Sequence, residues 1–128
     1  PQYLAMHGEP LHPQDLAHHA CLVYSQDFQA TRWTYGTHEG GIDVTVRPCL
    51  AANNGDALLQ AATQGMGITR PPDFMAQPAL DNGSVVQILT EYEPAPLGIY
   101  AVLPSNRYVP HRVSVLLDFL GQGLALQA

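Results

Sequence analysis

The chain has 128 residues, enough for one compact domain and too few for two of ordinary size. Hydrophobic residues make up 46% of it and charged residues 12%, so it can form a real core, and no apolar run approaches the 18 or so residues of a membrane span. The net charge is −6, with five scattered arginines and no lysine. We therefore do not expect this chain alone to bind a nucleic acid or an anionic membrane surface.

The first nineteen residues predict two short helices. Pro1 suits the first turn of one helix, which Gly8 can end, and Pro13 suits the first turn of a second helix over residues 13–19. Histidines crowd this stretch, but their spacing does not match the paired ligands of a zinc site, so we expect exposed histidines and no metal. They are His7, His12, His18 and His19.

Apolar runs further along predict strands. "CLVYS" has the pattern of a buried strand, and "RWTYGTHEGGIDVTV" that of a hairpin with a turn at residues 39–41. Trp33 and Tyr35 alternate at period two, which favours a packed or interface face over a ligand-stacking platform. Cys21 and Cys49 lie in apolar strand-like runs, so we expect two buried free thiols, with a redox pair as the alternative.

The stretch "LAANNGDALLQAATQGMGI" predicts a strand that turns at once into a helix. Leu58, Ala61, Ala62 and Gly65 share one helical face, and Gly65 or Gly67 can end the helix.

The rest of the chain predicts more alternation of strand and helix. "ITRPP" suggests a short strand, followed by a helix that starts after Pro72 and breaks near Pro78, then a turn at Asn82-Gly83. "VVQILTEY" and "LGIYAVLP" predict two strands joined by a stiff "EPAP" crossing, and a helix follows Pro110. The apolar stripe of that helix is Val113, Leu116, Leu117, Leu120 and Leu124. Alternating strands and helices predict an α/β fold with a mostly parallel sheet.

The strand-to-helix junction is the candidate site. Asn53 or Asn54 can cap the helix, Gly55 permits close backbone approach, and such junctions lie where open α/β sheets bind ligands. An anion at a helix end gains about 0.3–1 kcal/mol, or about 2 when partly buried, whereas micromolar binding needs about 8 kcal/mol. A second wall must therefore close over any ligand. The alternative, that the asparagines only cap the helix and nothing binds, remains open.

Three segments follow one another over nearly the whole chain: "YLAMHGEPLHPQDLAHHACLVYS", "ANNGDALLQAATQGMGITRPPDF" and "PLGIYAVLPSNRYVPHRVSVLLDFL". Together, in this order, they resemble the effector-binding region of LysR-type transcriptional regulators. The resemblance implies a fold like the type-II periplasmic binding proteins, with two lobes around an effector cleft. It implies that residues 1–93 form the complete second lobe, residues 94–96 a crossing, and residues 97–128 a strand and helix of the first lobe.

The resemblance also implies the site and the partners. The residues that match cleft positions are Asn53, Asn54, Gly55, Ser25, Thr69 and, as a lesser candidate, Arg70, for which a surface strand-end arginine is the alternative. It implies a small polar or anionic effector, often a carboxylate, a homo-oligomer, and DNA contact only through an N-terminal domain outside this chain. Because most of the first lobe is absent from this chain, we expect another chain, or a second copy, to cover the apolar stripe of the last helix. No cofactor is implied.

We therefore expect a sensory fragment of a cytoplasmic transcription regulator that performs no chemistry. The alternative is an extracytoplasmic solute-binding protein of a transporter, which would share the fold. An enzyme finds no support, because the chain has no G-x-S-x-G elbow and its "GMG" follows a helix instead of opening one.

Overall fold

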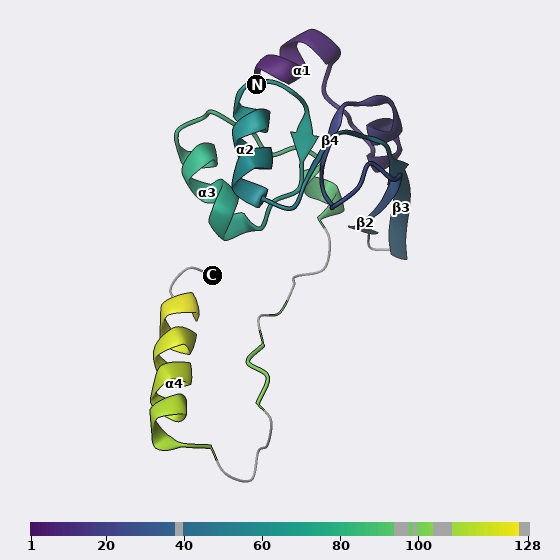
Figure 1. The fold of residues 1–128 in the computed structure, drawn as a ribbon. Helices are drawn as coiled ribbons and strands as arrows, with labels where there is room; N and C mark the ends of the chain where they lie inside the picture. Colours follow the sequence, from purple (N-terminus) through teal and green to yellow (C-terminus); the bar gives the residue numbers. More distant parts are fainter. Residues whose placement is uncertain (38–39, 94–97, 99, 104–108, 126–128) are drawn as a thin grey trace. The chain divides into compact units, whose positions relative to one another are not determined.

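The computed structural model describes residues 1–37, 40–93, 98, 100–103 and 109–125 (Figure 1). The chain divides into two compact units, Pro1–Ala95 and Pro96–Ala128. The assignment of these parts to lobes and a crossing stays a prediction. Among the described residues, no helix has the length and apolar character needed to cross a membrane.

A three-stranded parallel sheet forms the centre of the first unit. Its strands are β1 (Cys21–Tyr24), β4 (Pro48–Ala52) and β5 (Ile68–Thr69), in the order β4-β1-β5. Leu22 pairs with Leu50 on one side and with Thr69 on the other. β1 is buried because both of its neighbours come from this chain, which confirms the predicted buried strand.

The two faces of β1 belong to two hydrophobic clusters. Leu22 packs with Leu58 and Ala61 of α2 (Gly55–Thr63), so α2 covers one face of the sheet. Cys21 and Val23 point to the opposite face, because successive side chains of a strand alternate. That second cluster is completed by side chains from the hairpin, α1, η1 and β5: Tyr3, Leu16, Trp33, Tyr35, Val44, Val46 and Ile68.

The predicted hairpin is confirmed as β2 (Thr31–Thr37) paired antiparallel with β3 (Gly40–Val46), although Glu39 of its expected turn lies outside the described residues. Trp33 and Tyr35 are buried, which confirms the packed face. On the other face, the Thr34 hydroxyl donates to the Asp43 carboxylate at 2.7 Å.

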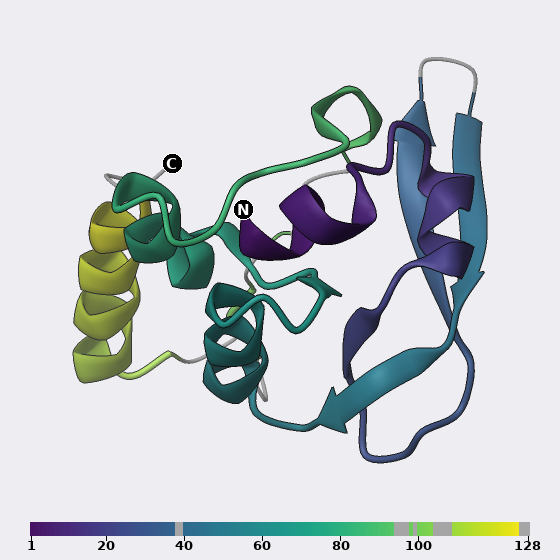
Figure 2. The same cartoon turned by 90° about the horizontal axis from the view of Figure 1, so that it is seen from above.

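Two short helices precede β1, as predicted, but the second is a 3-10 helix. They are α1 (Gln2–His7) and η1 (Pro13–His18), and η1 lies beside β3 (Figure 2). Tyr3 is the buried residue of α1, and its hydroxyl accepts the Ala20 N–H at 2.8 Å. The Asp15 carboxylate accepts the N–H groups of Leu11 and His12 at 3.1 and 2.9 Å, which closes the tight turn before η1.

The glycines after α2 determine how the chain returns to the sheet. Gly65 has φ +74, and the Gly65 and Met66 N–H groups donate to the Ala62 and Ala61 carbonyls, which is a Schellman ending. Two residues later, a Cβ on Gly67 would collide with the Ala20 carbonyl oxygen, next to the point where Ile68 N–H bonds the same oxygen at 2.9 Å. Only glycine fits there.

Two predictions for the end of the first unit are wrong. α3 (Asp73–Asp81) runs through Pro78 without a break, because the Pro78 carbonyl still accepts from Asn82 N–H at 3.3 Å. Residues 85–92 do not form a strand. Leu89 adopts left-handed φ 56 before the 3-10 turn η2 (Thr90–Tyr92), and this places Ile88, Leu89 and Tyr92 against the core instead of in a ladder.

The second unit contains α4 (His111–Ala125), which confirms the helix predicted after Pro110. The strand predicted over residues 97–104 is wrong for its described part, since residues 98 and 100–103 are irregular and the described part of this unit offers no strand for them to pair with. Several apolar side chains of α4 are exposed: Val115, Leu116, Phe119 and Leu120.

Candidate functional site

The carboxyl ends of the three parallel strands bring the predicted site residues to one edge of the sheet. Ser25 follows β1, Asn53 follows β4, and Thr69 and Arg70 lie at the end of β5. Because the strands are adjacent and parallel, these ends meet at the same edge, which is where open α/β sheets bind ligands. We call this edge the strand-end site.

Asn54, and not Asn53, caps α2. Its side-chain oxygen accepts the Ala57 N–H at 3.1 Å, and its carbonyl accepts the Leu58 N–H at 3.3 Å. The first two helical amides, those of Gly55 and Asp56, have no acceptor inside the helix by geometry. These amides and the helix dipole favour a negative or polar group at this end. The negative charge of the Asp56 side chain, in the same first turn, disfavours an anionic ligand.

Gly55 has a packing reason of its own. A Cβ there would lie 2.8 Å from Sδ and 3.0 Å from Cε of Met75, so the side chain of Met75 rests against the start of α2. The obstacle is the far end of a flexible side chain. Glycine thus leaves room for Met75 beside the helix terminus, and a ligand reaching the Gly55 amide would share that space with the thioether.

Ser25 is tied to the sheet by its backbone and to a turn by its side chain. Its N–H donates to the Ala52 carbonyl at 3.1 Å, which extends the pairing of β1 with β4 by one residue. Its hydroxyl donates to the Asp27 carboxylate at 3.2 Å and accepts the Asp27 N–H at 3.2 Å. Ser25 as a residue is half-buried, and its hydroxyl keeps one lone pair for a further donor.

Arg70 is held by two aromatic rings. Its guanidinium carbon lies 4.7 Å from the centre of the Tyr35 ring and 5.5 Å from that of Trp33, within cation–π range. Burial raises the pKa of the Tyr35 phenol to about 12, and the nearby Arg70 charge opposes that rise. The sequence predicted Arg70 as a lesser candidate but did not predict this support. Two features of the sequence point toward this contact. The aromatic residues of β2 alternate at period two, and Arg70 follows the inward-facing Ile68 by two residues.

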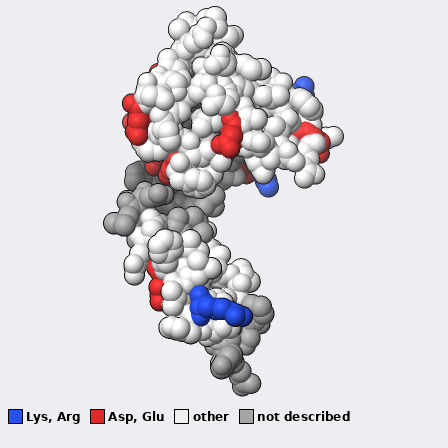
Figure 3. All heavy atoms as spheres, turned by 60° about the vertical axis from the view of Figure 1, so that its left-hand side comes forward, with Lys and Arg blue, Asp and Glu red and all other residues white. Residues whose placement is uncertain are grey.

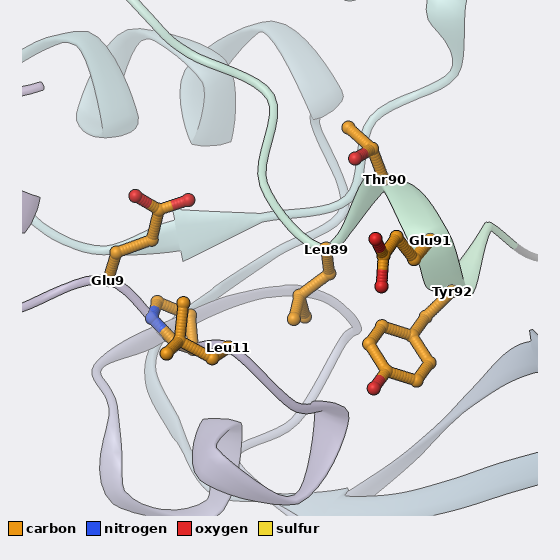
Figure 4. Close-up of a pocket in the computed structure, with 7 residues that line it drawn as sticks. Glu9, Leu11, Leu89, Thr90, Glu91 and Tyr92 are labelled. Atoms are coloured by element: carbon orange, nitrogen blue, oxygen red, sulfur yellow. The ribbon is translucent and has the colours of Figure 1, made fainter.

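Two surface hollows lie on the first unit, and the second of them adjoins the start of α2. One, of about 320 Å³, lies between residues 9–11 and 89–92, and Figure 4 shows Glu9 and Leu11 facing Leu89 and Glu91 across it. The other, of about 530 Å³, lies between α2 and α3 and includes Asp56 and Met75. Figure 3 shows acidic patches over the visible face of the first unit. The carboxylates at both hollows oppose an anionic ligand there.

The two cysteines differ, and the prediction that both are buried is wrong for one of them. Both are free thiols, with Cys21 buried and Cys49 exposed on the edge strand β4. Burial raises the pKa of Cys21 to about 12, which makes it a poor nucleophile at neutral pH. Within the described residues, no cluster of three or more metal-ligating side chains occurs.

Comparison with known proteins finds a matching domain family and relatives that are transcription regulators. The family model of the LysR substrate binding domain matches residues 1–125. An HTH-type transcriptional regulator of Haemophilus influenzae, itself uncharacterised, is 32% identical over 93% of the chain and 42% of its own length. The transcriptional activator TtdR of Escherichia coli K12 is 32% identical over 94% of the chain and 39% of its own length. The chain thus spans about two-fifths of these relatives.

Solved structures agree with the fold. The regulatory domain of CrgA, a LysR-type transcriptional regulator of Neisseria meningitidis, aligns with TM-score 0.73 at 28% identity, over 97% of this chain and 61% of that one. Full-length AphB, a virulence activator of Vibrio cholerae, aligns with TM-score 0.64 at 30% identity, over 72% of this chain and 31% of that one. These likenesses confirm the predicted fold class. The chain belongs to the family of LysR substrate-binding domains.

Proposed function

We propose that this chain is the larger part of the sensing module of a longer LysR-type transcription regulator, which binds a small polar or anionic effector at the strand-end site. The main observation behind this proposal is that Ser25, Asn54 and Thr69 lie at the carboxyl ends of three adjacent parallel strands, at the edge where α2 also begins. The curated relatives named above are transcription regulators, so the transporter alternative is not favoured.

A ligand at this site needs a second wall. One helix end supplies at most about 2 kcal/mol, far below the roughly 8 kcal/mol of micromolar binding. The CrgA regulatory domain is longer than the part that this chain matches. In our proposal, the corresponding remainder of the full-length protein forms the facing wall.

Sensing requires that the effector bind one conformation better than another. A closed arrangement of two walls around the ligand gains contacts that an open one lacks, and only this difference in affinity can shift the population. We propose that the shift reaches DNA-binding domains outside this chain, in a cytoplasmic homo-oligomer. The coupling needs no chemical step.

The test is a thermal-shift screen of the full-length protein against small polar and anionic metabolites. We expect at least one compound to raise the melting temperature in a saturable way. The deciding variant is Asn54→Asp, which keeps a side-chain acceptor for the Ala57 N–H but adds a negative charge at the proposed site. It should abolish the response to an anionic compound.

The matched control is Asn82→Asp. Asn82 ends α3, and its side chain accepts the Ser84 N–H at 2.9 Å, so the exchange makes the same charge change at another helix end. It should leave the response unchanged. An equal response of the wild type and Asn54→Asp to an anionic compound would remove the strand-end site from the account.

A further inference from the structure

We propose that Arg70 is the residue that selects a carboxylate in the effector, and that Tyr35 and Trp33 are positioning residues that hold its guanidinium for this task. The inference rests on the function proposed above and narrows its ligand class. The observation behind it is the guanidinium of Arg70 lying over two ring faces at the end of β5.

Strand alternation explains why Arg70 meets these rings. Ile68 of β5 packs into the cluster that contains Trp33 and Tyr35. Residues two apart on a strand point to the same face, so the Arg70 side chain leaves the sheet on the side of the hairpin. Both rings are buried, with 7% of each residue exposed, and they give the guanidinium a rigid floor.

A guanidinium that lies over aromatic rings can still donate hydrogen bonds. The cation–π attraction acts on its positive charge and uses none of its five N–H donors as hydrogen bonds to a carboxylate would. Arg70 is exposed, and among the residues that the structure describes no carboxylate lies within ion-pair distance of it. Arg32, in contrast, lies 3.6 Å from the Asp43 carboxylate. Arg70 is thus oriented but not neutralised.

The surrounding charges favour a carboxylate over a phosphate. A planar carboxylate accepts two parallel N–H bonds from a guanidinium, and its single negative charge matches the single positive charge of Arg70. Asp27 is bonded to Ser25, and Asp56 lies in the first turn of α2. These two acids at the same sheet edge repel a second negative charge on the ligand.

The test compares matched pairs of singly charged and neutral probes on the full-length protein: acetate with acetamide and benzoate with benzamide, together with inorganic phosphate. We expect at least one carboxylate to bind, measured by calorimetry, at least tenfold more tightly than its amide. Phosphate should not bind. Arg70→Gln should weaken the carboxylate by about 10- to 100-fold, as for loss of a charge-assisted hydrogen bond, and leave the amide unchanged.

Three further variants separate recognition from general damage. Arg47→Gln makes the same charge change at an exposed arginine after β3 and should preserve the selectivity. Tyr35→Phe keeps the ring and should also preserve it, whereas Tyr35→Leu should lower the ratio of amide to carboxylate dissociation constants. This ratio does not depend on how stable the protein is, so a merely structural role of Tyr35 would not change it.

The outcomes distinguish the two proposals. Carboxylate binding that survives Arg70→Gln, or tighter binding of amides or phosphate than of carboxylates, overturns the role of Arg70 alone. A ligand response that is lost in Asn54→Asp but kept in Arg70→Gln likewise overturns the role of Arg70 and leaves the strand-end site in place. Absence of any response to these probes and to the metabolite screen overturns both proposals.

Discussion

β1 and residues 100–103 are both short apolar segments with strand-like composition, yet only β1 is a strand. β1 has a parallel neighbour on each side, and both come from the first unit. Residues 100–103 have no strand beside them in the described part of the second unit, and Tyr100 and Val102 are 84% and 90% exposed. A strand needs partners for its backbone N–H and C=O groups, so composition alone does not produce one.

The same contrast separates α2 from α4. Both helices are amphipathic, but α2 buries Leu58, Leu59 and Ala61, whereas α4 leaves Leu116 and Phe119 exposed at 54% and 71%. In the first unit, sequence pattern and packing agree. In the second unit, the apolar face of α4 has no packing partner among the described residues. We therefore expect substitutions in the two units to change stability by very different amounts.

The largest expected difference comes from truncating one leucine in each unit. Leu22→Ala removes a side chain with 0% exposure from the central strand and should cost about 2–5 kcal/mol. Leu116→Ala removes a half-exposed one and should cost under about 1 kcal/mol. Urea unfolding of the 128-residue chain measures both. Equal costs would mean that α4 is packed as tightly as β1.

Glycine-to-alanine exchange should have opposite signs in the two units. Gly67→Ala drives a Cβ into the Ala20 carbonyl and should destabilise by about 1–3 kcal/mol. Gly121 lies within α4 with nothing near its Cβ position, so Gly121→Ala should increase helicity and stabilise by about 0.5–1 kcal/mol. Thermal unfolding followed by circular dichroism measures the stability of both variants against the wild type. A stabilising Gly67→Ala would show that the return from α2 is looser than described.

Alkaline pH should weaken the first unit through Cys21. Burial raises the pKa of its thiol to about 12 in the folded protein, against an ordinary value of 9.0. The folded state therefore keeps this thiol neutral at pH values where the unfolded chain ionises it. This stability is complete below pH 9 and is lost as pH rises toward 12, by about 1 kcal/mol at pH 10. Unfolding free energies at pH 8 and 10 measure it. Cys21→Ala should flatten the slope, and Cys49→Ala should keep most of it.

A smaller effect is expected in acid. Hydrogen bonds from the His12 and Leu11 amides hold the pKa of Asp15 below its ordinary value of 3.8. The stabilisation is therefore present above that value and is lost as pH falls through the lower, folded pKa. Asp15→Asn should reduce the loss of stability on acidification, measured by unfolding at pH 3 and pH 6. A steeper acid transition in Asp15→Asn would contradict the hydrogen bonds described before η1.

Sequence alone predicted most of the first unit, because local signals and packing agree there. The apolar patterns located β1 and the hairpin. The sequence offered Asn53 or Asn54 for the start of α2 and Gly65 or Gly67 for its end, and the structure uses Asn54 and Gly65. The 3-10 geometry of η1 and the unbroken α3 depend on which hydrogen bonds a short helix retains around proline. Residues 85–92 have strand composition, but their apolar side chains pack on the core through the left-handed Leu89. No local pattern encodes that choice.

The candidate site was predictable in its position but not in its contacts. Ser25, Asn54 and Thr69 follow apolar runs, so their common edge follows once the strands are known to be parallel. The exposure of Cys49 depends on β4 being an edge strand, which is a property of strand order. The cation–π contact of Arg70 with Trp33 and Tyr35 joins residues more than thirty positions apart, beyond the reach of any local signal.

The most direct measurement is a crystal structure of the full-length protein with the compound that stabilises it most in the metabolite screen. The account predicts the compound between two walls, with a polar group at the Gly55 and Asp56 amides and a contact to Ser25, Thr69 or Arg70. A compound bound in the hollow between residues 9–11 and 89–92, with the start of α2 covered by Met75 alone, would contradict it.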